Sequence, residues 1–283
     1  MNTYKRGISI FLPVYNEESR ILFTLKSIEW CDEVIVIDKG SIDKTVEIAS
    51  QFKNVTVIIK KEDNTYTSSE YNVYLDKCSY NYSMTVTASD IIHPDLAFKI
   101  KKLVDSLDFN YDAIEVPYKG YFLGIYEKFS PWYLESTIKV VKTCLINIQE
   151  GEVHAAIKSN IQTVYKITPS KEDEAYYHLT HESADGVLNR HIRYWRAEAS
   201  SPEPLNVPLK IVIKKTLSFL FYRRTFFKGK AAIALAFSYL TYYMITYIYR
   251  WNHMCNNATE VYRKIRDENL ILWEKAKNKK ITE

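Results

Sequence analysis

The sequence predicts an α/β fold in which a mostly parallel sheet is flanked by helices and followed by a C-terminal helical extension. Residues 8–118 alternate between short β-rich runs and amphipathic stretches, which is the pattern of repeated βαβ units. Polar, turn-forming residues follow each β-rich run. Beyond residue 200 the β pattern ends and helical patterns continue to the C-terminus.

The alternation sets the order of the elements. We expect strands at 8–14, 34–38, 55–60, 83–87 and 113–117. We expect helices near 17–29, 43–52, 69–78, 94–107 and 183–200. Looser β-like stretches at 136–148 and 161–167 predict an antiparallel extension that forms the acceptor side of a cleft. In such sheets ligands bind at the carboxyl ends of the parallel strands, so the residues after each strand are the candidates for chemistry.

Composition narrows the class of protein. The chain has 283 residues, of which 47% are apolar and 25% charged, so one α/β domain with an appended segment is expected and a disordered or fibrous protein is excluded. The four cysteines are far apart and form no CxxC pair, and no signal peptide is recognised. Disulfides and a zinc site are therefore not expected, and a reducing cytosol fits best.

Two strand-tip motifs predict a nucleotide pocket. "FLPVYNEE" joins the first strand to a helix start, and "VIVIDKGSIDKTVEIA" repeats the arrangement with Asp38 at the tip of a buried strand. A carboxylate at that position can accept a hydrogen bond from a base N–H, which suits recognition of a pyrimidine. Taken singly, each motif is also a common turn with a capped helix.

Together these motifs resemble the nucleotide-binding half of family 2 glycosyltransferases, which have the GT-A fold. Within that family the sequence is most similar to the lipopolysaccharide-core glucosyltransferase type. The segments that carry this similarity are "DEVIVIDKGSIDKT", "SEYNVYL", "GEVHA", "HLTHESADGVLNRHIRYW" and "YRRTFFKGKAAIALAFSYL". The resemblance implies a GT-A domain over 1–200, with a Rossmann-like nucleotide-binding half at 1–118 and an acceptor half at 119–200. A basic amphipathic helical tail then occupies 201–283.

The resemblance also implies roles for individual residues of the pocket. Pro13, Tyr15 and Glu17 would surround the uridine and ribose of a UDP-linked donor, and Asp38 would contact the uracil. Gly40 and Ser41 would shape the loop beneath the nucleotide. The pocket would thus hold a nucleotide sugar.

The sequence departs from the family at its metal motif. Alignment back from Pro94 puts Thr87 and Ser89 where the family has the two acids of D-x-D, and leaves Asp90 as the remaining carboxylate. Mg²⁺ or Mn²⁺ prefers anionic oxygen ligands, so the expected site is weak or depends on the nucleotide's own oxygens. Alternatively, Asp90 caps the helix near Pro94. Without a metal, the cations expected to neutralise the diphosphate are Lys39, Lys119 and His154.

The catalytic base is the second departure. Inverting transfer needs a base to take the acceptor hydroxyl's proton, and the family pattern places an acid after His154, where this chain has Ala155. Glu152, Glu150 and Glu182 are the candidate bases, and the predicted catalytic residues are Glu152, His154 and Glu182. If 151–155 is extended, Glu152 and His154 point to the same face.

The tail predicts a separate basic surface. Between Leu205 and Thr259 there are eight Lys and Arg residues and no acid, and 231–249 carries no charge. One helical face of that segment holds Ile233, Phe237, Leu240, Met244 and Ile248. This pattern favours an interfacial helix on an anionic membrane surface. The alternatives are packing on the catalytic domain or pairing in a homodimer. No nucleic-acid partner is expected, because no recognisable nucleic-acid module accompanies the basic residues.

Two functions from different classes therefore compete. The first is an inverting glycosyltransferase that moves a sugar from a nucleotide-sugar donor to a hydroxyl of a cell-surface glycan or lipid-linked acceptor. Its expected location is cytoplasmic and peripheral, on the inner face of the membrane. The second is a degenerate glycosyltransferase fold that binds a nucleotide sugar or glycan as a partner subunit without turnover.

Overall fold

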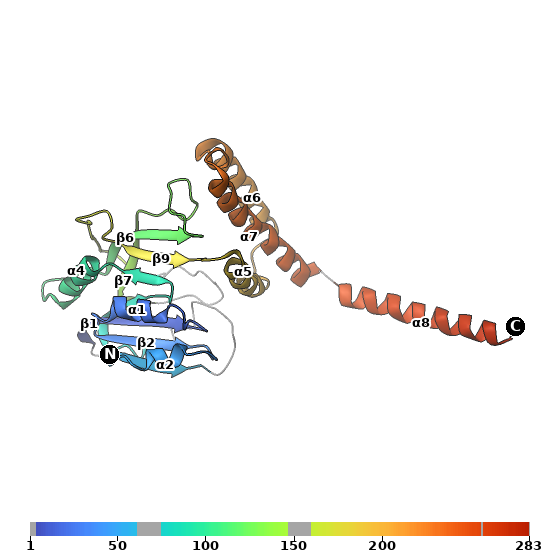
Figure 1. Ribbon diagram of the computed structural model, residues 1–283, viewed down its shortest axis with the longest axis horizontal. Coiled ribbons are helices and arrows are strands. Elements are labelled where there is room, and N and C mark those ends of the chain that lie inside the picture. Colours follow the sequence, from blue (N-terminus) through green and yellow to red (C-terminus); the bar gives the residue numbers. More distant parts are fainter. Residues whose placement is uncertain (1–3, 61–74, 147–159, 256, 283) are drawn as a thin grey trace.

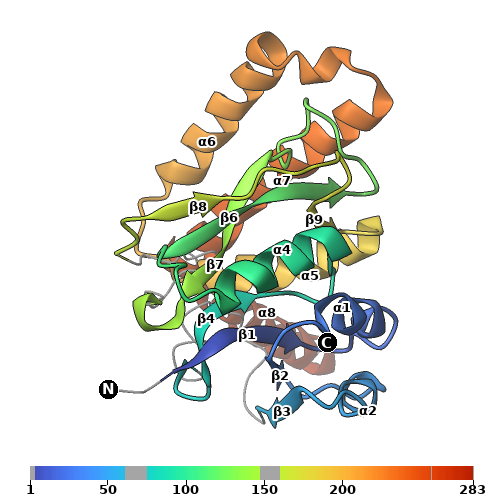
Figure 2. The same ribbon diagram turned by 90° about the vertical axis from the view of Figure 1, so that its left-hand side faces the viewer.

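The computed structural model describes residues 4–60, 75–146, 160–255 and 257–282. It confirms the predicted α/β class. A nine-stranded sheet has the order β3-β2-β1-β4-β7-β6-β9-β5, and β8 pairs with β6 off this path. Helices flank the sheet, and further helices follow at the C-terminus (Figures 1 and 2).

The first half of the sheet is parallel, as the βαβ pattern predicts. Its strands are β1 (Lys5–Val14), β2 (Glu33–Asp38), β3 (Val55–Ile59) and β4 (Tyr80–Thr85). The accompanying helices are α1 (Ile21–Ile28), α2 (Thr45–Ala49) and α4 (Pro94–Asp105). One face of β1 packs against the apolar stripes of α1 and α4, where burial of side chains such as Leu12, Leu25 and Ile100 stabilises the layer.

The second half of the sheet is mixed. The predicted antiparallel extension is confirmed for the strand within 136–148, whereas the strand within 161–167 runs parallel to its neighbour. β7 (Ser136–Lys142) is antiparallel to both β4 and β6 (Ala113–Phe122) and ends in a 3₁₀ turn, η2 (Thr143–Leu145). β8 (Val164–Lys166) and β9 (Tyr176–Thr180) run parallel to β6, and β5 (Asp90–Ile92) is antiparallel to β9. β5 and β9 were not predicted. The proposed boundary at residue 118 lies inside β6, whereas the division near residue 200 stays a prediction.

Helices follow the sheet in the C-terminal part of the chain. They are α5 (Ala184–Glu198), α6 (Asn206–Leu217), the π-helical turn η3 (Ser218–Tyr222), the 3₁₀ turn η4 (Thr225–Phe227) and α7 (Lys230–Cys255). α5 and α7 pack on the sheet domain, and α6 packs on α7. Leu235 of α7 is buried with Phe122 and Val187, and Trp195 Nε1 donates to the Tyr242 carbonyl at 3.0 Å. The last helix, α8 (Ala258–Thr282), extends away from the body (Figure 1).

The predicted apolar face of α7 is divided between packing and exposure. Leu240 is buried, whereas Phe237, Met244 and Ile248 are each more than half exposed. Within the described ranges, α7 is the one helix whose length and composition would suffice to cross a membrane, and 28% of its most apolar window is buried. One side of α7 therefore packs on the protein, as one of the alternatives predicted, and an apolar side of the helix remains exposed.

The two sides of α7 should respond differently to truncation. Leu235→Ala leaves a cavity against Phe122 and should lower the free energy of unfolding by about 3 kcal/mol. Phe237→Ala removes an exposed side chain and should change it by less than about 0.5 kcal/mol. Urea unfolding of both variants tests this, and equal effects would contradict the packing of α7 on the sheet domain.

Candidate functional site

Two loops at the carboxyl ends of β1 and β2 are joined side by side. The strands pair in register, so that Val14 lies opposite Asp38. The Asn16 N–H donates to Ser41 Oγ at 2.9 Å, and the Ile42 N–H donates to Asn16 Oδ1 at 2.9 Å. Asn16 has a φ of 54°, which asparagine adopts more readily than most residues. The two predicted motifs therefore form one structural unit.

A cavity of about 570 Å³ opens beside this unit. The loop after β1, the turn after β4, strands β6 and β9, helix α5 and helix α7 all contribute to its walls. α7 contributes Ser238, Tyr239, Tyr242 and Tyr243. The cavity thus extends from the predicted nucleotide motifs to the C-terminal helices, and its size suits a small-molecule ligand.

The predicted nucleotide residues fall into two groups. Pro13, Tyr15 and Glu17 line the cavity. Asp38, Gly40 and Ser41 are not among its lining residues. The Asp38 carboxylate is buried at the end of β2 and accepts hydrogen bonds from the N–H groups of Gly40 (3.1 Å) and Ser41 (3.2 Å). Asp38 therefore holds the second loop in shape in this conformation.

Asp90 is sealed behind the cavity wall. It is 1% exposed, whereas Thr87 and Ser89 of the same turn line the cavity. Its Oδ2 accepts from the Thr87 N–H at 2.6 Å, Thr87 Oγ1 at 2.9 Å and the Tyr176 hydroxyl at 2.7 Å. Its Oδ1 pairs with His178 Nδ1 at 2.5 Å. β9 therefore supplies two of the groups that hold this carboxylate.

The environment of Asp90 stabilises its charge. Burial would raise the pKa of Asp90, but the neighbouring charges of His178 and Lys139 outweigh burial and lower this pKa to about 2. The Lys139 ammonium lies 4.2 Å from the centre of the Tyr176 ring, beside the same cluster. The Asp90 carboxylate is therefore charged, and residues of the same chain already provide the groups that balance its charge.

Asp90 was predicted to bind a metal ion, and its contacts in the structure do not fit that role. Both carboxylate oxygens are already used, and the hydroxyls of Thr87 and Ser89, 2.8 Å apart, offer no negative charge to a Mg²⁺ or Mn²⁺ ion. Within the described ranges, no group of three or more His, Cys, Asp or Glu residues could hold a metal ion. The alternative role as a helix cap is wrong, because the residue that caps α4 is His93.

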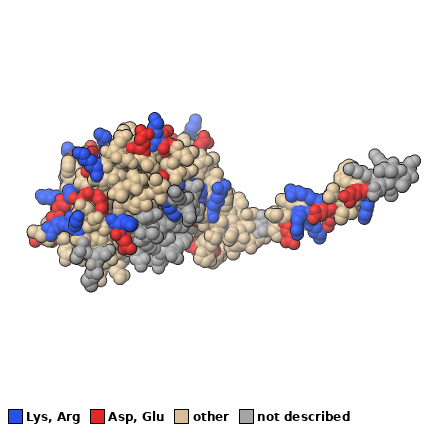
Figure 3. All heavy atoms as spheres, turned by 90° about the horizontal axis from the view of Figure 1, so that it is seen from below, with Lys and Arg blue, Asp and Glu red and all other residues tan. Residues whose placement is uncertain are grey.

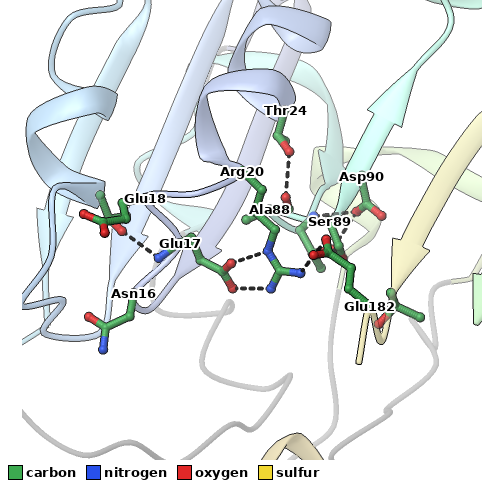
Figure 4. Close-up of polar contacts among 12 residues, drawn as sticks. Asn16, Glu17, Glu18, Arg20, Thr24, Ala88, Ser89, Asp90 and Glu182 are labelled. Carbon is green, nitrogen blue, oxygen red and sulfur yellow. Dashed lines mark hydrogen bonds and ion pairs between the residues drawn. The ribbon is translucent and has the colours of Figure 1, made fainter. Parts of the chain in front are cut away.

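Cationic side chains line the cavity instead. Arg20 forms a two-point ion pair with Glu17, and its Nη1 lies 3.8 Å from Glu182 (Figure 4). From α5, Arg190 and Arg193 also line the cavity, and Arg190 Nη1 donates to Thr180 Oγ1 at 2.8 Å. Sequence reasoning missed both α5 arginines, although their spacing of three residues on a predicted helix places them on neighbouring faces.

The histidine before Glu182 is also a cavity residue that sequence reasoning missed. His181 has a φ of 60°, and neither ring nitrogen has a hydrogen-bond partner in the structure. Burial and the nearby Arg190 charge lower the pKa of His181 to about 3, so its ring is neutral at pH 7. The alternation of Tyr176, His178 and Thr180 on one strand face is the signal that could have indicated β9.

Only part of the predicted catalytic set can be located. Glu150, Glu152 and His154 lie outside the described residues. The side chain of Glu182 is 71% exposed, lies next to Arg20, and is not among the residues that line the cavity. Glu198 of α5 does line the cavity. It accepts hydrogen bonds from the Tyr242 hydroxyl at 2.7 Å and from Thr246 Oγ1 at 3.4 Å, and these bonds tie α5 to α7.

Comparison with known protein families finds a match to the first half of the chain. The model of the family described as "Glycosyl transferase family 2" matches residues 9–156, which include both nucleotide motifs. Two curated relatives from Staphylococcus epidermidis, both named poly-beta-1,6-N-acetyl-D-glucosamine synthase, are 34% identical over 98 residues. The match covers 32% of this chain and 24% of each relative, so the chain spans about a quarter of the length of the relatives it matches.

Solved structures show more distant likeness. The crystal structure of Staphylococcus aureus TarS 1–349 is 16% identical, with 87% of this chain and 90% of that chain covered and a TM-score of 0.47. The same fragment in complex with UDP-GlcNAc is 14% identical, covers 87% and 91%, and has a TM-score of 0.45. Glucosyl-3-phosphoglycerate synthase from Mycobacterium tuberculosis, with Mn²⁺, UDP and phosphoglyceric acid, is 22% identical, covers 50% and 57%, and has a TM-score of 0.35.

Removing the Asp90 charge should destabilise the protein in a pH-dependent way. A pKa of about 2 in the fold, against an ordinary value of 3.8, corresponds to about 2 kcal/mol. Because the pKa is depressed in the fold, this contribution is full at pH 5 and is lost as the pH falls from about 4 to about 2. Asp90→Asn should therefore lower the free energy of unfolding by about 2 kcal/mol at pH 5, with a smaller difference in acid.

Urea unfolding of Asp90→Asn at several pH values measures this effect. The exposed Asp108 is a matched control, and Asp108→Asn should leave the unfolding curve unchanged at every pH. A loss for Asp90→Asn that stays constant from pH 5 to acid would show that the carboxylate charge is not what stabilises the fold.

Proposed function

The chain belongs to glycosyl transferase family 2, and we propose that it transfers a sugar from a UDP-linked donor to a hydroxyl group of a glycan or lipid-linked acceptor, with inversion. The observation that carries the proposal is the cavity at the carboxyl ends of the parallel strands, lined by Pro13, Tyr15 and Glu17 beside several cations. Fold and cavity position agree with the place where such sheets bind ligands.

The proposed reaction is a single displacement. The acceptor hydroxyl oxygen attacks the anomeric carbon from the face opposite the diphosphate, the bond from that carbon to the diphosphate oxygen breaks, and UDP leaves with the electron pair. A base removes the hydroxyl proton as the new bond forms. Glu152, Glu150 and Glu182 remain the proposed candidates for that base, with His154 beside Glu152.

The class of acceptor is proposed from the curated relatives and from the aromatic wall of the cavity. The name of the curated relatives indicates a sugar polymer, which supports a glycan as the acceptor class. The finer similarity to the lipopolysaccharide-core type also favours a surface glycan and stays a prediction. The aromatic wall of the cavity, including Tyr121, Trp132 and Tyr239, suits a sugar acceptor, because aromatic rings present large apolar faces beside polar groups.

The second candidate is a nucleotide-sugar-binding subunit without turnover. The burial of Asp90, together with Thr87 and Ser89 in place of acids, favours this candidate, since the family's usual metal ligands are absent from the described part of the cavity. Release of UDP from a panel of UDP-sugars, with a glycan acceptor present, separates the two. Turnover supports the transferase, and binding without release supports the subunit.

Asp38→Ala should abolish UDP binding that calorimetry detects for the unchanged protein. The substitution removes the proposed uracil acceptor and also the acceptor for the Gly40 and Ser41 N–H groups. Because that loop change can act on stability, Tyr15→Ala serves as a second variant, which alters only a lining side chain. Full UDP affinity in both variants would rule out this pocket as the nucleotide site.

We also propose a cytoplasmic, peripheral location on the inner face of the membrane. The α6–α7 surface consists here of the exposed apolar residues Leu209, Ile213, Leu217, Phe221, Phe227, Phe237, Met244 and Ile248. Exposed lysines such as Lys210 and Lys214 accompany it. Seen from below, the segment that joins the body to α8 is nearly uncharged, whereas α8 carries both signs of charge (Figure 3). An apolar surface bordered by cations complements anionic lipid.

Vesicle sedimentation should detect this association. The protein should pellet with anionic vesicles at low salt and less so as salt rises, because screening weakens the attraction. Ile213→Ser with Phe237→Ser should weaken binding, and Lys210→Gln with Lys214→Gln should weaken it by roughly tenfold or more. The exposed Phe98 of α4 is the matched control, and Phe98→Ser should bind normally. A protein that stays in the supernatant would leave the homodimer as the explanation of this surface.

A further inference from the structure

We propose that Arg190 and Arg193 of α5 neutralise the donor's diphosphate, so that nucleotide binding does not require a divalent cation. This inference rests on the proposed function and names the groups that would act at the same cavity. It replaces the metal predicted at Asp90 with a pair of guanidinium groups from a different element. Of the cations predicted in place of the metal, Lys39 also lines the cavity, and His154 lies outside the described residues.

Among the described residues, the cavity wall beside the nucleotide motifs offers a metal no carboxylate that lacks partners. Thr87 and Ser89 present neutral hydroxyls, and Asp90 lies behind them with both oxygens bonded. Among the described residues, the carboxylates that line the cavity are Glu17 and Glu198. Both oxygens of Glu17 pair with Arg20, and those of Glu198 accept from Tyr242 and Thr246. Each of these acids therefore already has partners within the chain.

The α5 arginines lack such partners. Neither Arg190 nor Arg193 forms an ion pair with a carboxylate in the part of the chain that the structure describes. Arg190 is anchored by its single hydrogen bond to Thr180 Oγ1, and its charge lowers the pKa of the neighbouring His181. Arg193 lies one turn further along the same helix and is exposed. Two positive charges without a carboxylate partner in the same cavity attract an anion, so their charge predicts an anion-binding site.

Guanidinium groups suit the chemistry of this leaving group. Each presents a planar set of N–H donors that can bind two phosphate oxygens at once. Negative charge grows on the diphosphate as its bond to the anomeric carbon breaks, and fixed cations beside it lower the energy of that transition state. Of the other predicted cations, Lys119 lies over the Tyr126 and Tyr177 rings and is not among the cavity-lining residues.

Calorimetry with UDP and with uridine tests the proposal, because uridine lacks the diphosphate. The unchanged protein should bind UDP in EDTA and in Mn²⁺ with dissociation constants within about threefold of each other. Arg190→Gln and Arg193→Gln should each weaken UDP binding by about tenfold or more and leave uridine binding unchanged. Arg196 of the same helix is exposed and outside the cavity, so Arg196→Gln is the matched control. Unfolding midpoints confirm that each variant is folded.

The outcomes separate the two proposals. UDP binding that needs Mn²⁺ would overturn the inference and leave the proposed function standing. Equal loss of UDP and uridine affinity in the arginine variants would also overturn it, since the arginines would then act on the pocket as a whole. Absence of UDP binding in both EDTA and Mn²⁺ would instead overturn the proposed function, and with it the inference.

Discussion

The buried carboxylate of Asp90 is the constraint on which the cavity depends. A charge with 1% exposure is tolerated only when other groups pair with it, and Asp90 receives hydrogen bonds from Thr87, Tyr176 and His178. These bonds connect the turn after β4 to β9 and draw the carboxylate away from the cavity. The hydroxyls of the turn then face the ligand space in its place.

The burial of the Asp90 carboxylate changes the charges that face the cavity. Where the family resemblance implies acids that recruit a cation, this chain pairs its acid internally and lines the cavity with arginines. The lining cations come from the turn before α1 (Arg20), from the residue after β2 (Lys39) and from α5 (Arg190 and Arg193).

α7 joins the cavity to the outside of the protein. Tyr239, Tyr242 and Tyr243 line the cavity, while Phe237 and Met244, on the other side of the helix, are exposed. The same helix is tied to α5 through Trp195 and Glu198. The surface proposed to meet lipid and the wall proposed to meet the acceptor thus belong to the same helix, which suits the proposal of a membrane-anchored acceptor.

The sequence by itself determined the parallel half of the sheet, its flanking helices and the cavity residues Pro13, Tyr15 and Glu17, because local periodicity and turn chemistry specify elements and strand tips. Tertiary structure decided the rest. Asp90 meets its partners across 86 and 88 residues, and Arg190 reaches the cavity only because α5 packs beside β9. Strands as short as β5 carry almost no periodic signal, and the protonation, burial and pairing of a carboxylate depend on neighbours that only the folded chain brings together.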